Sequence, residues 1–509
     1  MRLRDLATLL KPRQIVGELG DGPVGRVVGD SRQAAPGAVF FALPGTQADG
    51  HLFAAQAVAR GAVAVVVQRV VEGLKVAQLV VDDTRAALAV AAHEFYGRPS
   101  EAMTLVGVTG TNGKTTVSFL VEALLGAQGP TGLIGTVCWR WAGRQLRAQL
   151  TTPDAVELNR MLGQMQAEGV KGVVMEVSSH ALDQRRADAL AFDAGVFTNL
   201  SRDHLDYHQT LEAYFAAKAR LFTELLAPGT LGVICTDQPW GQRLASMARA
   251  RGIKVISFGL TQGTLMPREL ECTLEGTRVV TSWGGSELEI TSALLGRHNA
   301  LNLLAAASVG LGLGMEPEEV ARALGQVRVV PGRLERVWGP KWAPVVLVDY
   351  AHTPDALAVT LGAVRELTEG RIFCVFGAGG NRDQGKRPLM GQAVAQAADV
   401  AVLTSDNPRD EDPLAIMAMV EQGLQEGGMR RVHTQQELAR GRKVYMAVAE
   451  RGEAITMAIE AAGIQDVVVI AGKGHEDYQI VAGRRKPFDD RLRALEALMD
   501  RAASRTNGY

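Results

Sequence analysis

The residues from Gly110 to Thr116 are the first candidates for chemistry, because they could hold the phosphates of a nucleotide. They read Gly-Thr-Asn-Gly-Lys-Thr-Thr and lie between an apolar run, TLVGVT, and a run of helical composition, VSFLVEALL. Glycines in such a strand-to-helix turn let backbone N–H groups face phosphate oxygens, and the helix N-terminus adds a partial positive charge. Lys114 is then placed to reach the β- and γ-phosphates, and the Thr115 hydroxyl to bind magnesium.

The match to a phosphate-binding loop is incomplete, since Val108 stands where the usual pattern has its first glycine. The alternative is a glycine-rich turn without a ligand, but the order strand, loop, Gly-Lys-Thr and helix favours the nucleotide site. A second glycine run, at 377–380, follows another apolar segment. A dinucleotide fingerprint would need glycine at 382, where Arg382 stands, so we exclude a Rossmann-type cofactor site.

Charge and composition restrict the partners that the chain could bind. It has 54 Lys and Arg against 55 Asp and Glu, so no global basic field exists for nucleic acid or an anionic membrane. The four cysteines are scattered without a CxxC pair, which argues against a zinc site and fits a reducing compartment. The N-terminus is too charged for a signal peptide, and no run approaches the roughly 18 apolar residues of a membrane span. We therefore expect a cytoplasmic protein.

The elements that would position the site alternate between apolar, strand-like runs and Ala- or Leu-rich helical runs. The length of 509 residues predicts about three domains, which we place at 1–100, 101–332 and 333–509. The predicted strands include 39–43 in the first block, 104–110 and 172–177 in the second, and 343–350, 371–377, 399–405 and 466–472 in the third. This alternation indicates an α/β fold that is doubly wound in the third block.

Short motifs in a fixed order span all three blocks. They are TGTNGKTT (109–116), TTP (151–153), EVSSHAL (176–182), FTNLSRDHLDYH (197–208), AKARLF (217–222), GRHNALN (296–302), PGR (331–333), DYAHTPDAL (349–357), GNRDQGKRPLM (380–390), DNPR (406–409) and GKGHE (472–476). Together they resemble the Mur ligases, and more narrowly the branch that adds the third peptide residue to UDP-N-acetylmuramoyl-L-alanyl-D-glutamate. The resemblance implies an α/β, three-domain Mur ligase architecture. Its parts would be an N-terminal UDP-muramoyl substrate-binding domain, a central P-loop ATPase-like domain that binds ATP, and a C-terminal Rossmann-like domain that binds the amino acid.

The resemblance also implies a reaction of peptidoglycan synthesis. ATP would phosphorylate the D-glutamyl carboxylate, and an incoming amine would attack the acyl phosphate. Because anions must approach each other, such a reaction needs neutralisation by Mg²⁺ and lysine. The implied catalytic residues are Lys114, Glu176, His204 and Lys218, and the implied metal ligands are Thr115, Glu176, His204 and Lys218.

Lys218 would carry a carbamate, as N6-carboxylysine, because an unmodified ammonium would repel the metal. The structural alternatives are a solvated helix position for Lys218, a helix cap for Glu176 and a satisfied hydrogen bond for His204.

Further residues match the family's substrate sites. For ATP they are Gly110, Thr111, Asn112, Gly113, Lys114, Thr115, Thr116, His298, Asn302, Arg333 and Asp349. For the UDP-muramoyl dipeptide they are Ser31, Thr151, Thr152, Ser178, Gln184 and Arg186. Hydroxyl and guanidinium groups suit carboxylates and sugar oxygens, but hydroxyl residues also cap helices often, so a purely structural role stays open for each.

The incoming amino acid would bind in the third block. The matching residues are Arg382, Asp406, Asn407, Pro408, Arg409, Gly472 and Glu476. The DNPR form indicates meso-2,6-diaminopimelate, since Arg409 could bind its second carboxylate in a bidentate fork that L-lysine cannot fill. Asn381 departs from the aspartate common at that position, so L-lysine and L-ornithine stay open as substrates.

The motifs disfavour two other kinds of function. Another superfamily enzyme, such as the ligase that adds D-alanyl-D-alanine or a folylpolyglutamate synthetase, is disfavoured by the EVSSH, RDHLDYH, DNPR and GKGHE motifs. A non-catalytic nucleotide-binding relative is disfavoured because the phosphate-loop lysine and every implied metal ligand are present. We expect a monomer that binds ATP, the nucleotide sugar and a diamino acid, with no nucleic acid or membrane partner.

Overall fold

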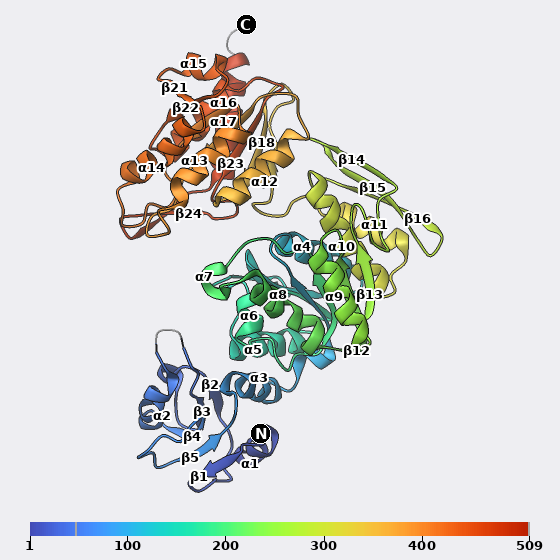
Figure 1. The fold of residues 1–509 in the computed structure, drawn as a ribbon, viewed down its shortest axis with the longest axis vertical. Helices are drawn as coiled ribbons and strands as arrows, with labels where there is room; N and C mark the ends of the chain where they lie inside the picture. The colour runs from blue at the N-terminus through green and yellow to red at the C-terminus, as the bar shows by residue number, and fades with distance from the viewer. Residues whose placement is uncertain (46–47, 507–509) are drawn as a thin grey trace. The chain divides into compact units, whose positions relative to one another are not determined.

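The computed structural model describes residues 1–45 and 48–506 (Figure 1). It divides into two compact units. The first holds Met1–Pro267, Thr281–Leu288 and Leu301–Leu324, and the second holds Arg268–Val280, Glu289–Ala300 and the chain from Gly325 onward. Each unit is an assembly of helices and sheets with its own buried core, as an α/β chain of this length requires.

The N-terminal part of the first unit is a five-stranded sheet with three helices. The strand order is β1-β5-β4-β3-β2, parallel except where β1 pairs with β5. The strands are β1 (Gln14–Val16), β2 (Arg26–Val28), β3 (Ala38–Phe41), β4 (Ala62–Val67) and β5 (Ala77–Val80). The helices are α1 (Leu3–Leu10), α2 (Ala54–Ala59) and α3 (Thr84–Phe95), with short 3₁₀ turns η1 (Ser31–Gln33), η2 (Gly50–Phe53) and η3 (Pro99–Ala102).

An eight-stranded sheet forms the centre of the first unit, in the order β13-β12-β11-β6-β10-β7-β8-β9. The strands are β6 (Thr104–Thr109), β7 (Thr131–Ile134), β8 (Cys138–Trp141), β9 (Arg144–Arg147), β10 (Gly172–Glu176), β11 (Phe192–Phe197), β12 (Leu226–Cys235) and β13 (Lys254–Phe258). The helices are α4 (Lys114–Gly126), α5 (Ala155–Ala167), α6 (Ser179–Asp183), α7 (Leu205–His208), α8 (Leu211–Arg220) and α9 (Pro239–Ala250), with a π-helical turn η4 (Leu221–Leu225). Because β6, β10 and β11 are parallel neighbours, the loops that follow them lie at one edge of the sheet.

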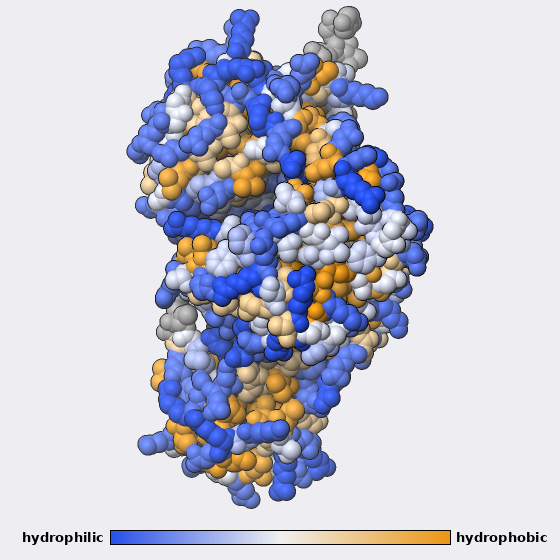
Figure 2. Space-filling view, turned by 45° about the vertical axis from the view of Figure 1, so that its right-hand side comes forward, coloured by the Kyte–Doolittle hydropathy of each residue, from blue (hydrophilic) through white to orange (hydrophobic). Residues whose placement is uncertain are grey.

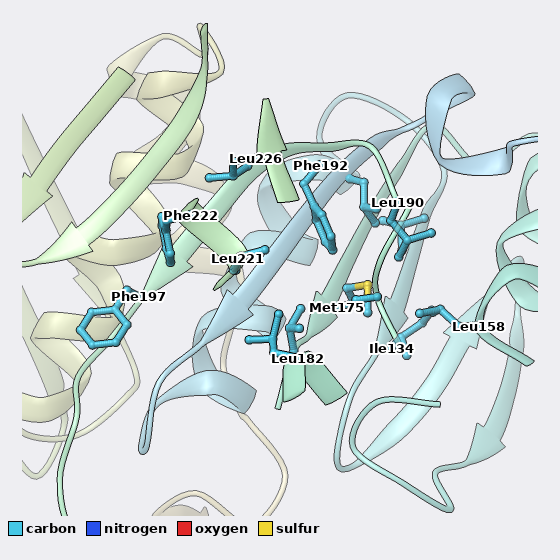
Figure 3. Close-up of a cluster of buried hydrophobic side chains, with 14 of the residues drawn as sticks. Ile134, Leu158, Met175, Leu182, Leu190, Phe192, Phe197, Leu221, Phe222 and Leu226 are labelled. Carbon is cyan, nitrogen blue, oxygen red and sulfur yellow. The ribbon is translucent and has the colours of Figure 1, made fainter. Parts of the chain in front are cut away.

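Apolar side chains hold this central sheet to its helices. Figure 3 shows part of the cluster, with Met175 from β10, Phe192 from β11, Leu158 from α5 and Leu182 from α6 among its members. All four side chains are buried. The edge that carries the phosphate loop is therefore anchored on a packed core rather than on free loops.

The residues of the next segment, 268–326, are divided between the two units. It comprises a three-stranded sheet of β14 (Glu269–Thr273), β15 (Gly276–Trp283) and β16 (Ser286–Ser292), then α10 (Arg297–Gly312) and α11 (Pro317–Gln326).

A seven-stranded sheet, in the order β17-β18-β23-β19-β20-β22-β21, forms the core of the second unit. Its strands are β17 (Glu335–Val337), β18 (Val345–Asp349), β19 (Ile372–Phe376), β20 (Val400–Leu403), β21 (Arg430–Arg431), β22 (Val444–Ala447) and β23 (Val467–Ala471), followed by the hairpin β24 (Tyr478–Val481) and β25 (Arg484–Pro487). Its helices are α12 (Pro354–Arg365), α13 (Lys386–Ala397), α14 (Pro413–Glu426), α15 (Gln435–Arg440), α16 (Arg451–Ala461) and α17 (Asp490–Thr506). All ladder pairs within the seven strands are parallel except β17 with β18.

Helices cover both faces of this sheet, because alternate strand residues point to opposite sides and both sets are apolar. Leu347, Cys374 and Val469 pack with α12, α13 and α14, whereas Val348 and Phe373 pack with α15, α16 and α17. The doubly wound α/β arrangement predicted for this block is confirmed, as are the strands predicted near 343–350, 371–377, 399–405 and 466–472.

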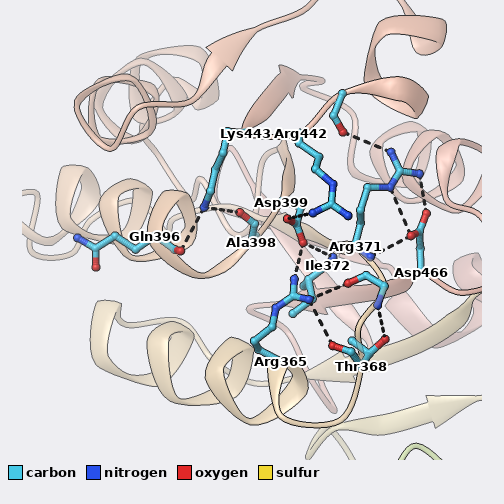
Figure 4. Close-up of polar contacts among 12 residues, drawn as sticks. Arg365, Thr368, Arg371, Ile372, Gln396, Ala398, Asp399, Arg442, Lys443 and Asp466 are labelled. Atoms are coloured by element: carbon cyan, nitrogen blue, oxygen red, sulfur yellow. Dashed lines mark hydrogen bonds and ion pairs between the residues drawn. The ribbon is translucent and has the colours of Figure 1, made fainter.

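Ion pairs fasten the end of this sheet remote from the DNPR motif (Figure 4). Arg371 pairs with Asp466 at 2.6 Å, and Asp399 binds Arg365 and accepts from the backbone N–H of Ile372 at 2.9 Å. The Lys443 ammonium donates to three carbonyl oxygens at the C-terminus of α13, at 2.6, 3.2 and 3.0 Å. The Lys443 ammonium complements the partial negative charge at the C-terminus of α13 and so stabilises the helix.

On the face drawn in Figure 2, hydrophilic side chains are interspersed with smaller apolar areas. Among the residues that the structure describes, no helix is long and apolar enough to cross a membrane.

Candidate active site

The phosphate loop has a backbone that only glycine suits at two positions. Gly110 has φ of 145°, and a Cβ there would lie 1.9 Å from the Thr198 hydroxyl oxygen. Gly113 has φ of 86°, and a Cβ there would lie 2.5 Å from the side-chain oxygen of Asn302. The loop is therefore held close to the turn after β11 and to α10. The helix predicted after the loop is α4, which begins at Lys114, three residues before the predicted run.

Two lysine ammonium groups meet at one carbonyl oxygen of this loop. The Gly110 oxygen accepts from Lys114 Nζ at 3.0 Å and from Lys218 Nζ at 2.8 Å, although Lys218 lies on α8. Lys218 is 1% exposed. Burial and the nearby Lys114 charge lower the pKa of Lys218 well below its usual value. The solvated helix position considered for Lys218 is therefore wrong.

Tyr214, one helical turn before Lys218, contacts both Lys218 and the phosphate loop. The Lys218 ammonium lies 4.4 Å from the centre of the Tyr214 ring. The Tyr214 hydroxyl is 3.3 Å from the Thr111 hydroxyl, and burial raises the pKa of Tyr214 to about 12. Tyr214 was not predicted, although its spacing of four residues from Lys218 was a signal that the two share a helix face.

Glu176 ends β10 beside the strand that leads into the phosphate loop. Its backbone pairs with Val108 in the parallel register, so its carboxylate lies at the loop edge of the sheet. Glu176 is 1% exposed, and its two oxygens accept from the backbone N–H and the hydroxyl of Thr136, both at 2.9 Å. These bonds hold the carboxylate in one orientation. Thr136 was also missed, because the short strand before it carries no motif.

His204 lies in the turn before α7 with φ of 52°. Its side chain is 46% exposed, and its Nε2 is 3.6 Å from the Asp203 carboxylate. The His180 ring packs edge-on against it with centroids 4.9 Å apart. Burial, with the nearby His204, lowers the pKa of His180. A second ring, that of Tyr214, has its centroid 6.0 Å from that of His204, so the half-exposed His204 side chain has rings on two sides.

A connected set of side chains extends from Glu176 along the same edge. The Thr136 and Thr151 hydroxyls are 3.1 Å apart, and the Thr152 hydroxyl donates to the Glu176 backbone oxygen at 2.8 Å. The Ser178 backbone N–H donates back to the Thr152 hydroxyl at 3.1 Å. Five of the six residues predicted for the muramoyl dipeptide belong to one cluster with Glu176. They are Thr151, Thr152, Ser178, Gln184 and Arg186.

Arg186 links Thr152 to Gln184 in this cluster. It donates to the Thr152 backbone oxygen at 3.0 Å and to the Gln184 side-chain oxygen at 2.6 Å. The Gln184 amide in turn lies 3.3 Å from the Tyr207 hydroxyl. Ser31 lies apart in the N-terminal sheet region, where its hydroxyl donates to Gln56 at 2.7 Å.

The residues predicted for adenosine fall in both units. Asn302 lies against Gly113, whereas His298, Arg333 and Asp349 belong to the second unit. The Arg333 guanidinium lies 5.5 Å from the centre of the Tyr350 ring. Burial lowers the pKa of His298 against the opposing charge of Asp349.

The Asp349 carboxylate already has partners within the second unit. It accepts from the backbone N–H groups of Leu334 and Ala351, both at 2.9 Å, and from the Thr360 hydroxyl at 3.1 Å. These bonds fix the turn that follows β18.

The residues predicted for the amino acid gather where β20 and β23 end. The Asn407 amide donates to Glu476 at 3.0 Å. The buried Lys473 ammonium is 3.5 Å from Asp406, 3.3 Å from Asn407 and 3.4 Å from Glu476. Lys473 is a functional candidate that was missed, although it stands inside the GKGHE motif.

Arg409 follows Asp406, Asn407 and Pro408 in the same turn. Its backbone has φ of 55°, and its guanidinium donates to the Gly380 carbonyl oxygen. A Cβ added to Gly379 would lie 3.3 Å from that guanidinium, so the Arg409 side chain lies along the 377–380 glycine run. Arg382 is exposed on the turn after this run. The glycine run therefore leaves room for the Arg409 side chain to lie along it.

Comparison with known proteins agrees with these motifs. Three family models match in order: Mur ligase family, catalytic domain, over residues 24–96; Mur ligase middle domain, over 108–310; and Mur ligase, glutamate ligase domain, over 332–474. A relative from Geobacter metallireducens is 47% identical over 84% of this chain and 85% of its own length. The chain belongs to the Mur ligase family. That relative is named UDP-N-acetylmuramoyl-L-alanyl-D-glutamate--2,6-diaminopimelate ligase, and a relative from Aquifex aeolicus with the same name is 45% identical over 78% of this Mur ligase and 80% of its own length.

Solved structures extend the likeness to the whole Mur ligase chain. A structure of a UDP-N-acetylmuramoyl-L-alanyl-D-glutamate--2,6-diaminopimelate ligase superposes with a TM-score of 0.73 at 32% identity and covers 99% of both chains. MurF from Thermotoga maritima in complex with ADP gives a TM-score of 0.60 at 18% identity, over 95% of this chain and 99% of that one, and shows the fold alone. The predicted three-domain Mur ligase architecture is confirmed.

Proposed function

We propose that this Mur ligase joins meso-2,6-diaminopimelate to the D-glutamyl carboxylate of UDP-N-acetylmuramoyl-L-alanyl-D-glutamate, with cleavage of ATP. The diaminopimelate ligase names of relatives that are 42–47% identical over most of the chain support the reaction and the amine. The reaction forms an amide in peptidoglycan synthesis by way of an acyl phosphate. Its substrates are small molecules, and we propose that it acts as a cytoplasmic monomer.

The observation that carries the proposal is the meeting of Lys114 and Lys218 at the Gly110 carbonyl, beside Glu176. A phosphate loop alone would fit many nucleotide-binding proteins. A second, deeply buried lysine at the same carbonyl oxygen is costly as an ammonium, because the two like charges repel each other. That cost is removed if Lys218 is converted to an anion.

Lys218 suits that conversion. Burial and the Lys114 charge lower the pKa of Lys218, which favours the neutral amine, the form that adds CO₂. The resulting carbamate would place a negative charge beside Lys114 in place of a positive one. We therefore propose that Lys218 is N6-carboxylysine in the active enzyme.

The donor set at this sheet edge fits Mg²⁺. Oxygen ligands are what this ion prefers, and Glu176 offers a buried carboxylate whose orientation is fixed by Thr136. Among the described residues, no three histidine, cysteine or carboxylate side chains are close enough to form a metal group. The residues that would hold the ion are Thr115, Glu176, His204 and the Lys218 carbamate. When bound, Mg²⁺ neutralises charge on the phosphates and on the carboxylate under attack.

The chain's own groups divide the remaining work. Lys114 and the backbone N–H groups of 110–116 would bind the β- and γ-phosphates. The cluster of Thr151, Thr152, Ser178, Gln184 and Arg186 would hold the muramoyl dipeptide, with Ser31 on the uridine side. His298, Asn302, Arg333 and Asp349 would contact adenosine. Asp406, Asn407, Glu476 and Gly472 would hold the diamino acid, with Arg382 and Arg409 directed to its carboxylates.

Selection of the diamino acid would rest on Arg409. A guanidinium binds a second carboxylate in a two-point contact, and L-lysine has no such carboxylate. L-lysine and L-ornithine remain the alternative amines for the same reaction.

Phosphate release from ATP tests the function. Purified protein with Mg²⁺ and UDP-N-acetylmuramoyl-L-alanyl-D-glutamate receives meso-diaminopimelate, L-lysine or L-ornithine in separate reactions. We expect release with meso-diaminopimelate that depends on the nucleotide sugar. Release with lysine or ornithine alone would retain the reaction and refute the role given to Arg409, and no release with any amine would refute the function.

A further inference from the structure

Lys473 is a fully buried lysine at the centre of the amino-acid pocket. Its side chain is 0% exposed. Its ammonium nitrogen lies near three side-chain oxygens, of Asp406 at 3.5 Å, Glu476 at 3.4 Å and Asn407 at 3.3 Å, and 5.5 Å from the centre of the Tyr478 ring. Asp406, Asn407 and Glu476 are all residues proposed above to bind the diamino acid, whereas no role has been proposed for Lys473.

The backbone around Lys473 is built to turn this side chain inward. Gly472 and Gly474 on either side have φ of 117° and 51°, in the region that favours glycine. A Cβ at position 474 would lie 2.8 Å from the Tyr350 Cβ, so the turn is pressed against the end of β18. Side chains at either position would force this turn to open, and Lys473 would lose its direction.

The charges around Lys473 do not balance within the pocket. Two carboxylates, Asp406 and Glu476, share a single buried ammonium, which leaves one negative charge in excess. The neighbouring Arg451 does not supply the difference, because it forms a fully buried pair with Asp490 at 2.7 Å. One excess negative charge is what a single ammonium group of a ligand would neutralise.

Lys386 is a further cation within electrostatic range of Asp406. Lys386 is half-buried, and its ammonium is 3.4 Å from the His352 carbonyl oxygen. Burial, followed by the charge of Arg382, lowers its pKa, and Asp406 opposes that effect. These groups line the region in which a ligand carboxylate would be held, together with Arg409.

We propose that Lys473 is a positioning and specificity residue, a built-in counter-ion that orients Asp406 and Glu476 and leaves room for one ammonium group. This inference rests on the proposed function. It makes the pocket discriminate by net charge as well as by shape: meso-diaminopimelate carries two ammonium and two carboxylate groups, whereas L-lysine carries one carboxylate fewer and one net positive charge more.

The inference makes an asymmetric prediction for Lys473→Met, which keeps the length of the side chain and removes its charge. The pocket would then hold two excess negative charges and unpaired carboxylates. The KM for meso-diaminopimelate should rise about tenfold or more, because a unit charge within a few Å in a partly buried site is worth at least that factor. The ratio of kcat/KM for meso-diaminopimelate to that for L-lysine should fall by about tenfold, while the KM values for ATP and the nucleotide sugar stay within about twofold.

Two further variants separate charge from packing. The control Lys443→Met removes an ammonium of the same domain that contacts only helix carbonyls, and it should change stability but none of the KM values. The double variant Lys473→Met with Glu476→Gln returns the pocket to one excess negative charge. Its preference for meso-diaminopimelate over L-lysine should recover by at least about threefold relative to Lys473→Met.

The experiment measures all three KM values, kcat, the amine preference and thermal unfolding for each protein. The wild-type reaction is measured first, so that its absence would refute the proposed function before Lys473 is tested. An unchanged KM and amine preference in folded Lys473→Met would overturn the inference, as would an equal rise in all three KM values. If Lys473→Met does not fold, the double variant is compared with Glu476→Gln alone, and identical amine preferences in those two would overturn it.

Discussion

Replacement of Lys218 by alanine tests the chemistry proposed for the phosphate loop. The substitution removes the amine that would carry the carbamate and leaves the glycine turn, Lys114 and Glu176 in place. We expect a folded protein that binds ATP but has lost most of its turnover, because the anion that faces Lys114 and Mg²⁺ is gone. A short carboxylic acid that enters the space should restore part of the activity.

The expected magnitude follows from the shared carbonyl. Since Lys114 and Lys218 lie 3.0 and 2.8 Å from the same Gly110 oxygen, their nitrogens are at most about 6 Å apart, and at an effective dielectric constant near 20 two like charges there repel by about 3 kcal/mol. A carbamate reverses the sign and gives an attraction of similar size. Loss of that attraction corresponds to a fall in kcat of about 100-fold.

The assay is phosphate release under saturating substrates, with and without formate or acetate. The control is Lys254→Ala, an exposed lysine on β13, which shows whether added carboxylate affects the enzyme in general. Wild-type enzyme is also prepared in CO₂-free buffer and then supplied with ¹³C-bicarbonate, so that a carbamate carbon can be detected by NMR.

Three results would distinguish whether Lys218 has a role in turnover and whether it carries a carbamate. Full activity of Lys218→Ala would refute a role for this residue. A large loss with no recovery in acetate, together with no ¹³C signal in wild-type enzyme, would refute the carbamate. Recovery of about tenfold in acetate by Lys218→Ala, and none by Lys254→Ala, would support it.

Three further predictions follow from other contacts. Asp490→Asn leaves the buried Arg451 charge uncompensated and should lower the free energy of unfolding by about 3–5 kcal/mol in urea titrations; a loss below about 1 kcal/mol would contradict a fully buried pair. Arg409→Ala should raise the KM for meso-diaminopimelate by about 100-fold with little change for L-lysine, and equal changes for both amines would show that Arg409 does not bind the second carboxylate. Burial lowers the pKa of His208 in the folded state, so the unfolded chain takes up its proton first and stability should fall as the pH drops below about 6.5; urea midpoints between pH 7 and 5 should fall less steeply in His208→Gln, and an unchanged slope would contradict this.

The sequence predicted the fold class well because its signals were local. Apolar runs such as those of β6, β19 and β23 read as strands directly, and the glycines of the phosphate loop stood between a strand and a helix. The same local signals did not predict the hairpin of β24 and β25, or β8 and the edge strand β9, which are short strands in antiparallel pairs. Pairing of that kind depends on tertiary contact rather than on composition.

The candidate site was predictable where a motif carried it and missed where a partner lay elsewhere in the chain. Thr136 holds Glu176 across a separation of 40 residues, and nothing near Thr136 distinguishes it from any other threonine after a short strand. Tyr214 could have been found from its helical spacing to Lys218. Lys473 stands inside the GKGHE motif, but a lysine between two glycines gives no local sign that it is buried against two carboxylates.

Lys218 and Lys473 show why burial alone does not define what a lysine does. Both ammonium groups are removed from water, and each approaches partners distant in sequence: Lys218 reaches Gly110 across 108 residues, and Lys473 reaches Asn407 across 66. Lys218 meets another cation, so its charged form is disfavoured and a reaction that turns it into an anion becomes favourable. Lys473 meets two carboxylates, the buried Asp406 and the partly buried Glu476, so its charge compensates theirs. The sign of the nearest charges is thus the basis for the different roles proposed for the two lysines, and those charges are brought together only by the fold.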